Sequence, residues 1–372
     1  MSDDLICTSF EATIGSDRYE VIVSNRSDEA VHSYLSAFSP KSIFIIADSY
    51  FKNSSVLPSR SFCDLLSDHC TYYVDGGVEM KSLKSLELIC DQLFESSIPR
   101  DGVIVALGGG VVGDLAAMAS SIYQRGMKLI HIPTTTTSML DSSIGGKTGV
   151  NHKGQVNLLG TYHNPDALFC DSRFLRTLPQ RDLIAGICES IKKSLISDYS
   201  AVDFFSSNSN KILALDPDAL HKMICWSIKQ KLFFVSSDFK ESSTRLLLNY
   251  GHTFGQAFES FYGLYQDYLR HGEAVSLGIC CAGYLTDKVF DNSQLNNLQA
   301  KLLSMYGLPC RISELSLPSL PLISQLTPLL KNDKKRVSTG NRFVLLEDIG
   351  RPHILSDVED ELLSEAFDVV LN

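Results

Sequence analysis

The chain has 372 residues, of which 44% are hydrophobic and 20% are charged, and its formal net charge at pH 7 is −10. A chain of this length and composition can bury a sizeable core and typically forms two domains. The negative charge and the lack of a basic stripe in the sequence argue against nucleic-acid binding, because phosphate backbones require clustered lysine and arginine.

The ten cysteines are scattered, with Cys280 and Cys281 adjacent and no CxxC pair. This pattern favours small buried thiols in a reducing cytosol over a disulfide framework or a thiolate zinc site. The N-terminal segment has no basic region followed by an apolar core, and no run of eighteen apolar residues occurs. The sequence therefore predicts a cytoplasmic protein with no membrane contact.

Short apolar strands alternate with helical patterns in the first half of the chain. Strands are expected at residues 42–48 (SIFIIAD), 102–110 (GVIVALGGG) and 128–134 (KLIHIPT). This alternation predicts an α/β domain with a parallel sheet, which we place at residues 1–178.

Helical periodicity dominates from about Pro179 onward. Apolar residues recur three and four apart in residues 181–196, 218–238 and 271–290. A lone late strand is expected at 342–350, and the Pro- and Leu-rich stretch 315–331 is expected to form connecting turns. We therefore predict a mainly helical second domain at residues 179–372.

Two segments have the character of a nucleotide site. Gly108, Gly109 and Gly110 follow an apolar strand and precede a helical run, where backbone amides and a helix N-terminus can hold a pyrophosphate. The spacing GGGxxGD differs from GxGxxG, so a glycine turn without a ligand is the alternative. Downstream, a run of threonines, Asp141 and Lys147 offer hydrogen bonds to a ribose or nicotinamide and a cation to a phosphate.

The second half carries a set of metal-ligand side chains. Glu189, His252 and His271 supply one carboxylate and two imidazoles, the ligand set of an open catalytic zinc site. Glu189 and Lys192 are three residues apart and share a helix face.

A second polar face is predicted around His252. Arg245, Asn249, His252 and Gln256 are separated by four, three and four residues, so they share one face if the helix is continuous through Gly251. Any one of these residues is explained by a salt bridge or a satisfied core position. Together they favour a ligand, because a polar face in an apolar neighbourhood is costly without one.

Six segments in chain order resemble motifs of the 3-dehydroquinate synthase family, within the sugar phosphate cyclases. They are GGGVVGDLAAMASSIYQRG, PTTTTSMLDSSIGGKTGVN, LRTLPQRDLIAGICESIK, RLLLNYGHTFG, HGEAV and NDKKRVSTGNRFVLLEDIG. The resemblance implies an N-terminal NAD-binding α/β domain, a helical metal-binding C-terminal domain, a cleft between them and a homodimer.

The resemblance also implies roles for individual residues. Glu189, His252 and His271 resemble ligands of Zn²⁺ or another divalent ion such as Co²⁺. The positions that resemble substrate-pocket residues of the family are Asp141, Lys147, Asn157, Lys192, Arg245, Asn249 and Lys335. Gln256 also stands at a pocket position. Arg125 resembles the arginine that reaches a phosphate across the dimer. Residues that resemble NAD contacts are Asp48, Lys81, Gly108, Gly109, Gly110, Gly113, Asp114, Thr134, Thr135, Asp141, Lys147 and Thr177.

The family reaction, as the resemblance implies it, converts a sugar phosphate into a carbocycle. Zinc binds vicinal hydroxyls, NAD accepts a hydride, phosphate is eliminated, the hydride returns and an intramolecular aldol step closes the ring. In the shikimate pathway of aromatic amino acid biosynthesis the substrate is a 2-keto acid sugar phosphate.

Three positions depart from the pattern of the family. Val156 stands where a lysine usually precedes the asparagine, Gln256 where a second histidine follows the zinc histidine, and Val78 where a glutamate often lies near the NAD ribose. Glutamine can hydrogen-bond a phosphate oxygen, but it carries neither charge nor proton at neutral pH.

These departures leave three functional hypotheses. Arg245 and Asn249 favour a 2-keto acid substrate and hence a 3-dehydroquinate synthase. Val156 favours a cyclase of specialised metabolism, acting on an amino analogue, sedoheptulose 7-phosphate or glucose 6-phosphate. The third hypothesis, a non-catalytic NAD-binding homologue, conflicts with the complete set of metal ligands.

Overall fold

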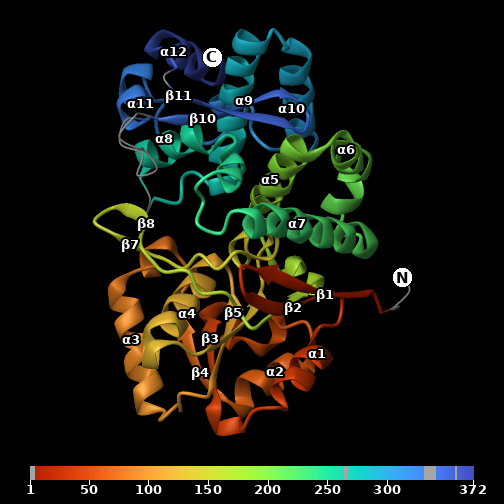
Figure 1. The fold of residues 1–372 in the computed structure, drawn as a ribbon, viewed down its shortest axis with the longest axis vertical. Coiled ribbons are helices and arrows are strands. Elements are labelled where there is room, and N and C mark those ends of the chain that lie inside the picture. The colour runs from red at the N-terminus through yellow and green to blue at the C-terminus, as the bar shows by residue number, and fades with distance from the viewer. Residues whose placement is uncertain (1–4, 264–265, 331–340, 357) are drawn as a thin grey trace. The chain divides into compact units, whose positions relative to one another are not determined.

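The computed structural model describes residues 5–263, 266–330, 341–356 and 358–372 (Figure 1). The chain divides into two compact units, one formed by Met1–Pro179 and Leu215–Ser236 and the other by Gln180–Ala214 and Ser237–Asn372. The chain therefore returns to the first unit at Leu215, which the predicted boundary at residue 178 did not include. Across the described residues, none of the helices combines the length and apolar content that crossing a membrane requires.

A seven-stranded sheet forms the centre of the first unit. Its strand order is β1-β2-β9-β6-β5-β3-β4, and every neighbouring pair is parallel except β1 with β2. The strands are β1 (Cys7–Ile14), β2 (Asp17–Ser24), β3 (Ile43–Asp48), β4 (Cys70–Val74), β5 (Val103–Gly108), β6 (Lys128–Pro133) and β9 (Ala167–Asp171). The predicted parallel α/β layer is confirmed.

Both faces of the central strands are covered. The runs IFIIA in β3 and VIVALG in β5 are buried throughout, as expected for parallel strands with apolar residues on both faces. On one face, Phe44, Ile46 and Ile104 belong to a core cluster with residues of α3 (Leu83–Glu95) and α4 (Gly110–Ile122). The unit also contains α1 (Asp28–Leu35), α2 (Arg60–Asp68), α7 (Pro217–Ser237) and the hairpin of β7 (Val150–His152) and β8 (Gln155–Leu159).

The second unit is built around helix α9 (His271–Phe290). Helix α9 is buried along most of its length and packs against α5, α8, α10 and α12, which can be followed in Figure 1. The helices of this unit besides α9 are α5 (Gln180–Ser197), α6 (Tyr199–Leu213), α8 (His252–Tyr262), α10 (Ser293–Met305), α11 (Ile323–Leu330) and α12 (Asp360–Leu371). The predicted helical second half is confirmed.

Two local predictions were wrong. The strand expected to stand alone, β10 (Arg342–Asp348), pairs antiparallel with β11 (Arg351–Ser356), whose sequence RPHILS has no alternating apolar pattern. Part of the stretch expected to form turns is helix α11, which forms despite Pro328 because its buried Leu326 and Leu330 pack on one side. Tertiary burial outweighs weak local propensity in both segments.

Candidate functional site

The three predicted metal ligands converge in the second unit. The Oε1 atom of Glu189 lies 3.5 Å from Nε2 of His252 and 3.4 Å from Nε2 of His271. Ligand atoms about 2.1 Å from a tetrahedral zinc ion lie about 3.4 Å from one another. The two imidazole rings are 5.2 Å apart at their centroids. The spacing of these atoms therefore fits a divalent ion held between them.

Each histidine is held through its other ring nitrogen. Nδ1 of His252 lies 3.2 Å from the backbone oxygen of Tyr250, and Nδ1 of His271 lies 2.9 Å from Oε1 of Glu259. A proton on Nδ1 that is donated to these oxygens leaves the Nε2 lone pair available to a metal. The sequence analysis did not single out Glu259, although it lies on the same helix as His252, two turns later.

Glu189 is buried and its two carboxylate oxygens have different surroundings. Nζ of Lys192 donates to Oε2 at 2.5 Å, whereas Oε1 accepts no hydrogen bond of normal geometry from the described residues. Burial by itself would raise the pKa of Glu189, but Lys192, His252 and His271 outweigh burial and hold the pKa well below its usual range. Glu189 is therefore an ionised ligand with one oxygen directed at the metal position. The predicted shared face of Glu189 and Lys192 is confirmed.

The continuous helix predicted from Arg245 to Gln256 is not formed. Residues Thr244–Asn249 form a 3-10 helix, and α8 begins only at His252. Gly251 separates them with φ +77°, and a Cβ at this residue would lie 2.7 Å from Cγ1 of Ile279. The positive φ and the close approach of α9 break the helix here. His252 and Gln256 remain one turn apart on α8.

Arg245 and Asn249 are anchored by the loop that precedes them. Nη1 of the buried Arg245 donates to the backbone oxygen of Phe239 at 2.8 Å, and Asp238 accepts the Arg245 backbone N–H at 3.1 Å. Nδ2 of Asn249 donates to Oε1 of Glu241 at 3.2 Å. Arg245 and Asn249 are thus held in place by residues of the preceding loop.

The glycine-rich turn of the first unit joins β5 to the N-terminus of α4. A Cβ at Gly108 would lie 2.7 Å from Cβ of Val112, and one at Gly109 would lie 2.9 Å from Cγ2 of Thr135. The backbone N–H of Thr134 donates to the Gly108 oxygen at 3.0 Å, so the two predicted loops are joined. Side chains are excluded from this turn, and the first amides of α4 point out of the helix toward an incoming anion.

Other predicted cofactor contacts lie around the same turn. Asp48 ends β3, which pairs with β5, and its Oδ1 accepts the Tyr50 N–H at 3.0 Å. Burial raises the pKa of Asp48. Lys81 and Asp114 form an ion pair, and burial raises the pKa of Asp114 although Lys81 opposes the shift. The carboxyl ends of parallel strands are where α/β sheets bind nucleotides.

Asp141 has a partner that the sequence analysis missed. Nζ of Lys231, on α7, lies 2.6 Å from Oδ1 of Asp141, and Lys231 is 8% exposed. The buried stripe of α7 includes Ile224 and Ile228, and Lys231 continues the same stripe. A lysine in place of an expected apolar residue was the signal that could have identified it.

The remaining predicted residues lie nearer the surface or outside the described part of the chain. Lys147, Asn157 and Arg125 are exposed, and the Asn157 N–H donates to Oδ1 of Asn151 at 2.9 Å. The Thr177 hydroxyl donates to the Phe174 oxygen at 2.7 Å. Lys335 lies outside the described residues. The roles of all these residues stay predictions.

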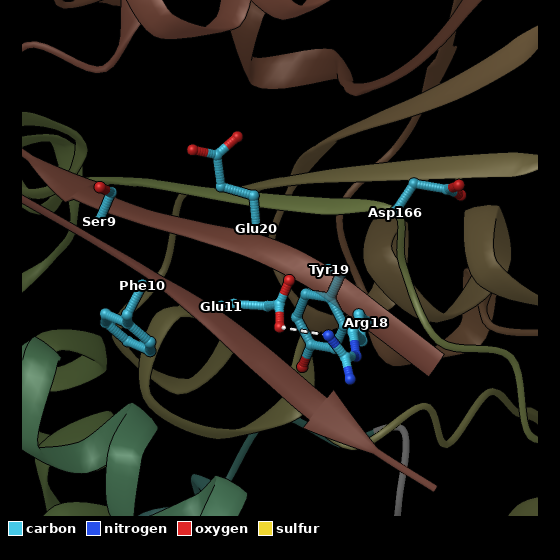
Figure 2. Close-up of a pocket in the computed structure, with 7 residues that line it drawn as sticks. All are labelled: Ser9, Phe10, Glu11, Arg18, Tyr19, Glu20 and Asp166. Atoms are coloured by element: carbon cyan, nitrogen blue, oxygen red, sulfur yellow. Dashed lines mark ion pairs between the residues drawn. The ribbon is translucent and has the colours of Figure 1, made fainter. Parts of the chain in front are cut away.

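A separate pocket of about 360 Å³ lies along β1 and β2. Nη1 of Arg18 lies 3.5 Å from Oε1 of Glu11 there, and a dashed line marks this ion pair in Figure 2. The pocket is lined by Ser9, Phe10, Glu11, Arg18, Tyr19, Glu20 and Asp166. It contains none of the predicted site residues, and its three carboxylates would repel a sugar phosphate.

Two family models match the chain. The model described as 3-dehydroquinate synthase N-terminal matches residues 71–185, and the one described as 3-dehydroquinate synthase C-terminal matches residues 186–336. The chain belongs to the 3-dehydroquinate synthase family. Membership of this family confirms the resemblance seen in the motifs and the predicted enzyme class, a phosphate-eliminating sugar phosphate cyclase.

Relatives and solved structures agree with this family. A 3-dehydroquinate synthase of Prochlorococcus marinus is 36% identical over 366 residues, covering 95% of this chain and 97% of the relative. One from Dictyoglomus thermophilum is 41% identical over 303 residues, covering 81% and 82%. A 2-deoxy-scyllo-inosose synthase in complex with carbaglucose-6-phosphate, NAD+ and Co²⁺ superposes with TM-score 0.84 at 26% identity, covering 98% of this chain and all of the other.

A further solved structure supports the fold alone. The 2-epi-5-epi-valiolone synthase of Streptomyces hygroscopicus subsp. jinggangensis superposes with TM-score 0.82 at 23% identity, covering 96% of this chain and 98% of the other. The fold of this chain is therefore shared by a protein whose sequence has diverged widely from it.

Proposed function

We propose that the protein is an NAD- and zinc-dependent 3-dehydroquinate synthase, or a close relative that acts on a 2-keto acid sugar phosphate. The observation that carries this proposal is the arrangement of Glu189, His252 and His271, whose ligand atoms are spaced for a divalent ion. Further support comes from the family and from the 2-deoxy-scyllo-inosose synthase structure, which holds NAD+ and Co²⁺.

When bound, the metal would lower the pKa of a substrate alcohol, and NAD would reversibly accept a hydride. The chain contributes the charges and hydrogen bonds around them. Lys192 holds the second oxygen of Glu189, so Glu189 offers a single oxygen to the metal. No side chain fits at Gly108 or Gly109. We propose that the cofactor pyrophosphate approaches the N-terminus of α4 at these two residues.

The residues assigned to the substrate would act by orienting and neutralising it. Arg245 carries a fixed positive charge suited to the carboxylate of a 2-keto acid, and Asn249 supplies an amide beside it. Asp141, which pairs with Lys231, is assigned the role of accepting a hydrogen bond from a substrate hydroxyl. Lys147, Asn157 and Arg125 are proposed to bind the phosphate, with Arg125 acting in a neighbouring subunit of a homodimer. The homodimer and the cytoplasmic location are part of this proposal.

One observation favours a second candidate function. The side chain of Val156 is 37% exposed and stands where a lysine is expected, so one cation that would meet a substrate carboxylate is missing. A cyclase of specialised metabolism that acts on sedoheptulose 7-phosphate or glucose 6-phosphate, which lack the carboxylate, would not need this cation. Lys153, also exposed and in the same hairpin, is the chain's own candidate to replace it.

Parallel assays of phosphate release test both candidates. The purified protein with NAD and Zn²⁺ would receive 3-deoxy-arabino-heptulosonate 7-phosphate, its amino analogue, sedoheptulose 7-phosphate and glucose 6-phosphate, and product masses would be recorded. Turnover of the first substrate is expected. Turnover of only one of the others would support specialised metabolism, and no turnover by a zinc-loaded, NAD-binding protein would support a non-catalytic homologue.

A further inference from the structure

We propose that Glu259 is a positioning residue that orients His271 for metal binding. This inference rests on the metal site of the proposed function and adds a residue that is not itself a ligand. Glu259 lies on α8 seven residues after His252, so both residues face the same side of that helix. Helix α8 therefore supplies one ligand directly and fixes the second ligand, which belongs to α9.

His271 needs such a support because of its place in the fold. It is the first residue of α9 and its side chain is 44% exposed, so packing alone restrains the ring only in part. The hydrogen bond of 2.9 Å between Nδ1 and Glu259 restricts rotation of the imidazole. With the ring held this way, Nε2 lies 3.4 Å from Oε1 of Glu189. A carboxylate that accepts from a ligating histidine also makes that histidine a stronger donor to the metal.

The packing of α8 against α9 brings Glu259 to His271. A Cβ on Gly251 would lie 2.9 Å from the oxygen of Val275, and a Cβ on Gly255 would lie 3.0 Å from the oxygen of Ala274. Glu259 lies one helical turn after Gly255 on α8, and His271 lies about one turn before Ala274 on α9. The hydrogen bond between Glu259 and His271 therefore continues the line of contacts that begins at the two glycines. The three contacts form one series on an antiparallel pair of helices. Close approach at the two glycines therefore sets the register that aligns the carboxylate with the imidazole.

Zinc affinity tests this role without any substrate. The full-length protein would be stripped of metal and titrated with Zn²⁺ against a chromophoric chelator, and the Co²⁺-loaded protein would be examined by visible absorption. Glu259→Ala is expected to weaken zinc binding about 10- to 100-fold and to change the Co²⁺ spectrum. Glu259→Gln is expected to lose less affinity, because its amide oxygen can still accept from Nδ1. Ser260→Ala, at an exposed neighbouring position on α8, serves as the matched control and should behave as wild type.

The outcomes separate this proposal from the proposed function. Unchanged zinc affinity and an unchanged Co²⁺ spectrum in Glu259→Ala would overturn the role of Glu259, and so would an equal loss in Ser260→Ala. If the alanine variant does not fold, Glu259→Leu takes its place, because leucine keeps much of the bulk but cannot accept from Nδ1 of His271. A wild-type zinc affinity and Co²⁺ spectrum in that variant would overturn the role of Glu259. A wild-type protein that binds zinc but releases no phosphate would contradict the cyclase function alone.

Discussion

Lys231 and Asp141 form an ion pair of 2.6 Å that joins helix α7 to the short π-helix Ser138–Ser142, which follows β6. Asp141 lies in the threonine-rich segment predicted to contact substrate and cofactor, whereas Lys231 comes about ninety residues later in the sequence. The return of the chain to the first unit at Leu215 makes this contact possible. The Asp141 side chain is thus paired with a cation from a distant segment.

Replacing Lys231 should impair catalysis more than folding. In Lys231→Met the Asp141 carboxylate loses its cation and its fixed orientation, so we expect kcat/KM to fall about 100-fold or more. Lys231→Arg should retain part of the activity, because the charge remains but the length differs. Steady-state phosphate release measures the effect. Lys229→Met, on the same helix with its Nζ over the Phe10 ring, is the control, and an equal loss there would contradict a specific role for Lys231.

Substitution of Gly278 should separate helices α8 and α9. A Cβ at this residue would collide with the backbone oxygen of Gly251, which cannot move as a flexible side chain can. We expect Gly278→Ala to lower the free energy of unfolding by about 2–4 kcal/mol and to weaken metal retention. Urea unfolding and zinc content measure both effects. Gly76→Ala, where nothing lies within 4 Å of the added carbon, should change neither. Normal zinc retention in the Gly278 variant would argue against register control of the centre.

His131 should make the protein less stable in mild acid. Burial, with His163 nearby, lowers the pKa of His131 to about 4, so the folded chain keeps it neutral where an unfolded chain would protonate it. Because the folded pKa is depressed, the stability contribution is present in full above pH 6.5 and is lost as the pH falls toward 4. The total loss is about 3 kcal/mol. Urea unfolding across this range should show a smaller loss for His131→Gln than for wild type, and the same loss in both proteins would contradict the prediction.

The departures at residues 156 and 256 can be reversed in one variant. If they only weaken a 3-dehydroquinate synthase, Gln256→His combined with Val156→Lys should raise kcat/KM on 3-deoxy-arabino-heptulosonate 7-phosphate. The reason is that a cation and a titratable group are restored to the predicted pocket. Steady-state kinetics measures the change, with each single variant as its control. A decrease would indicate a site adapted to a different substrate.

The sequence predicted those features that depend on local pattern. The apolar runs of β3 and β5 and the ligand types at Glu189, His252 and His271 are all visible in one dimension. Contacts between segments that are distant in the sequence could not be predicted from local pattern. The helix break at Gly251 follows from the close approach of Ile279, and β11 forms because β10 is available to pair with it. Lys231 is an intermediate example, since its place on an apolar stripe was visible but its partner was not.

The two histidines of the metal centre differ in whether a substitution elsewhere can change their orientation. His252 is oriented by the backbone oxygen of Tyr250, which every amino acid at that position would also provide. His271 is oriented by a side chain, so a single codon change at residue 259 is enough to modify it. Divergence within the family can therefore adjust the electron donation and affinity of one ligand gradually, while the other ligand is inherited unchanged unless the main chain itself moves.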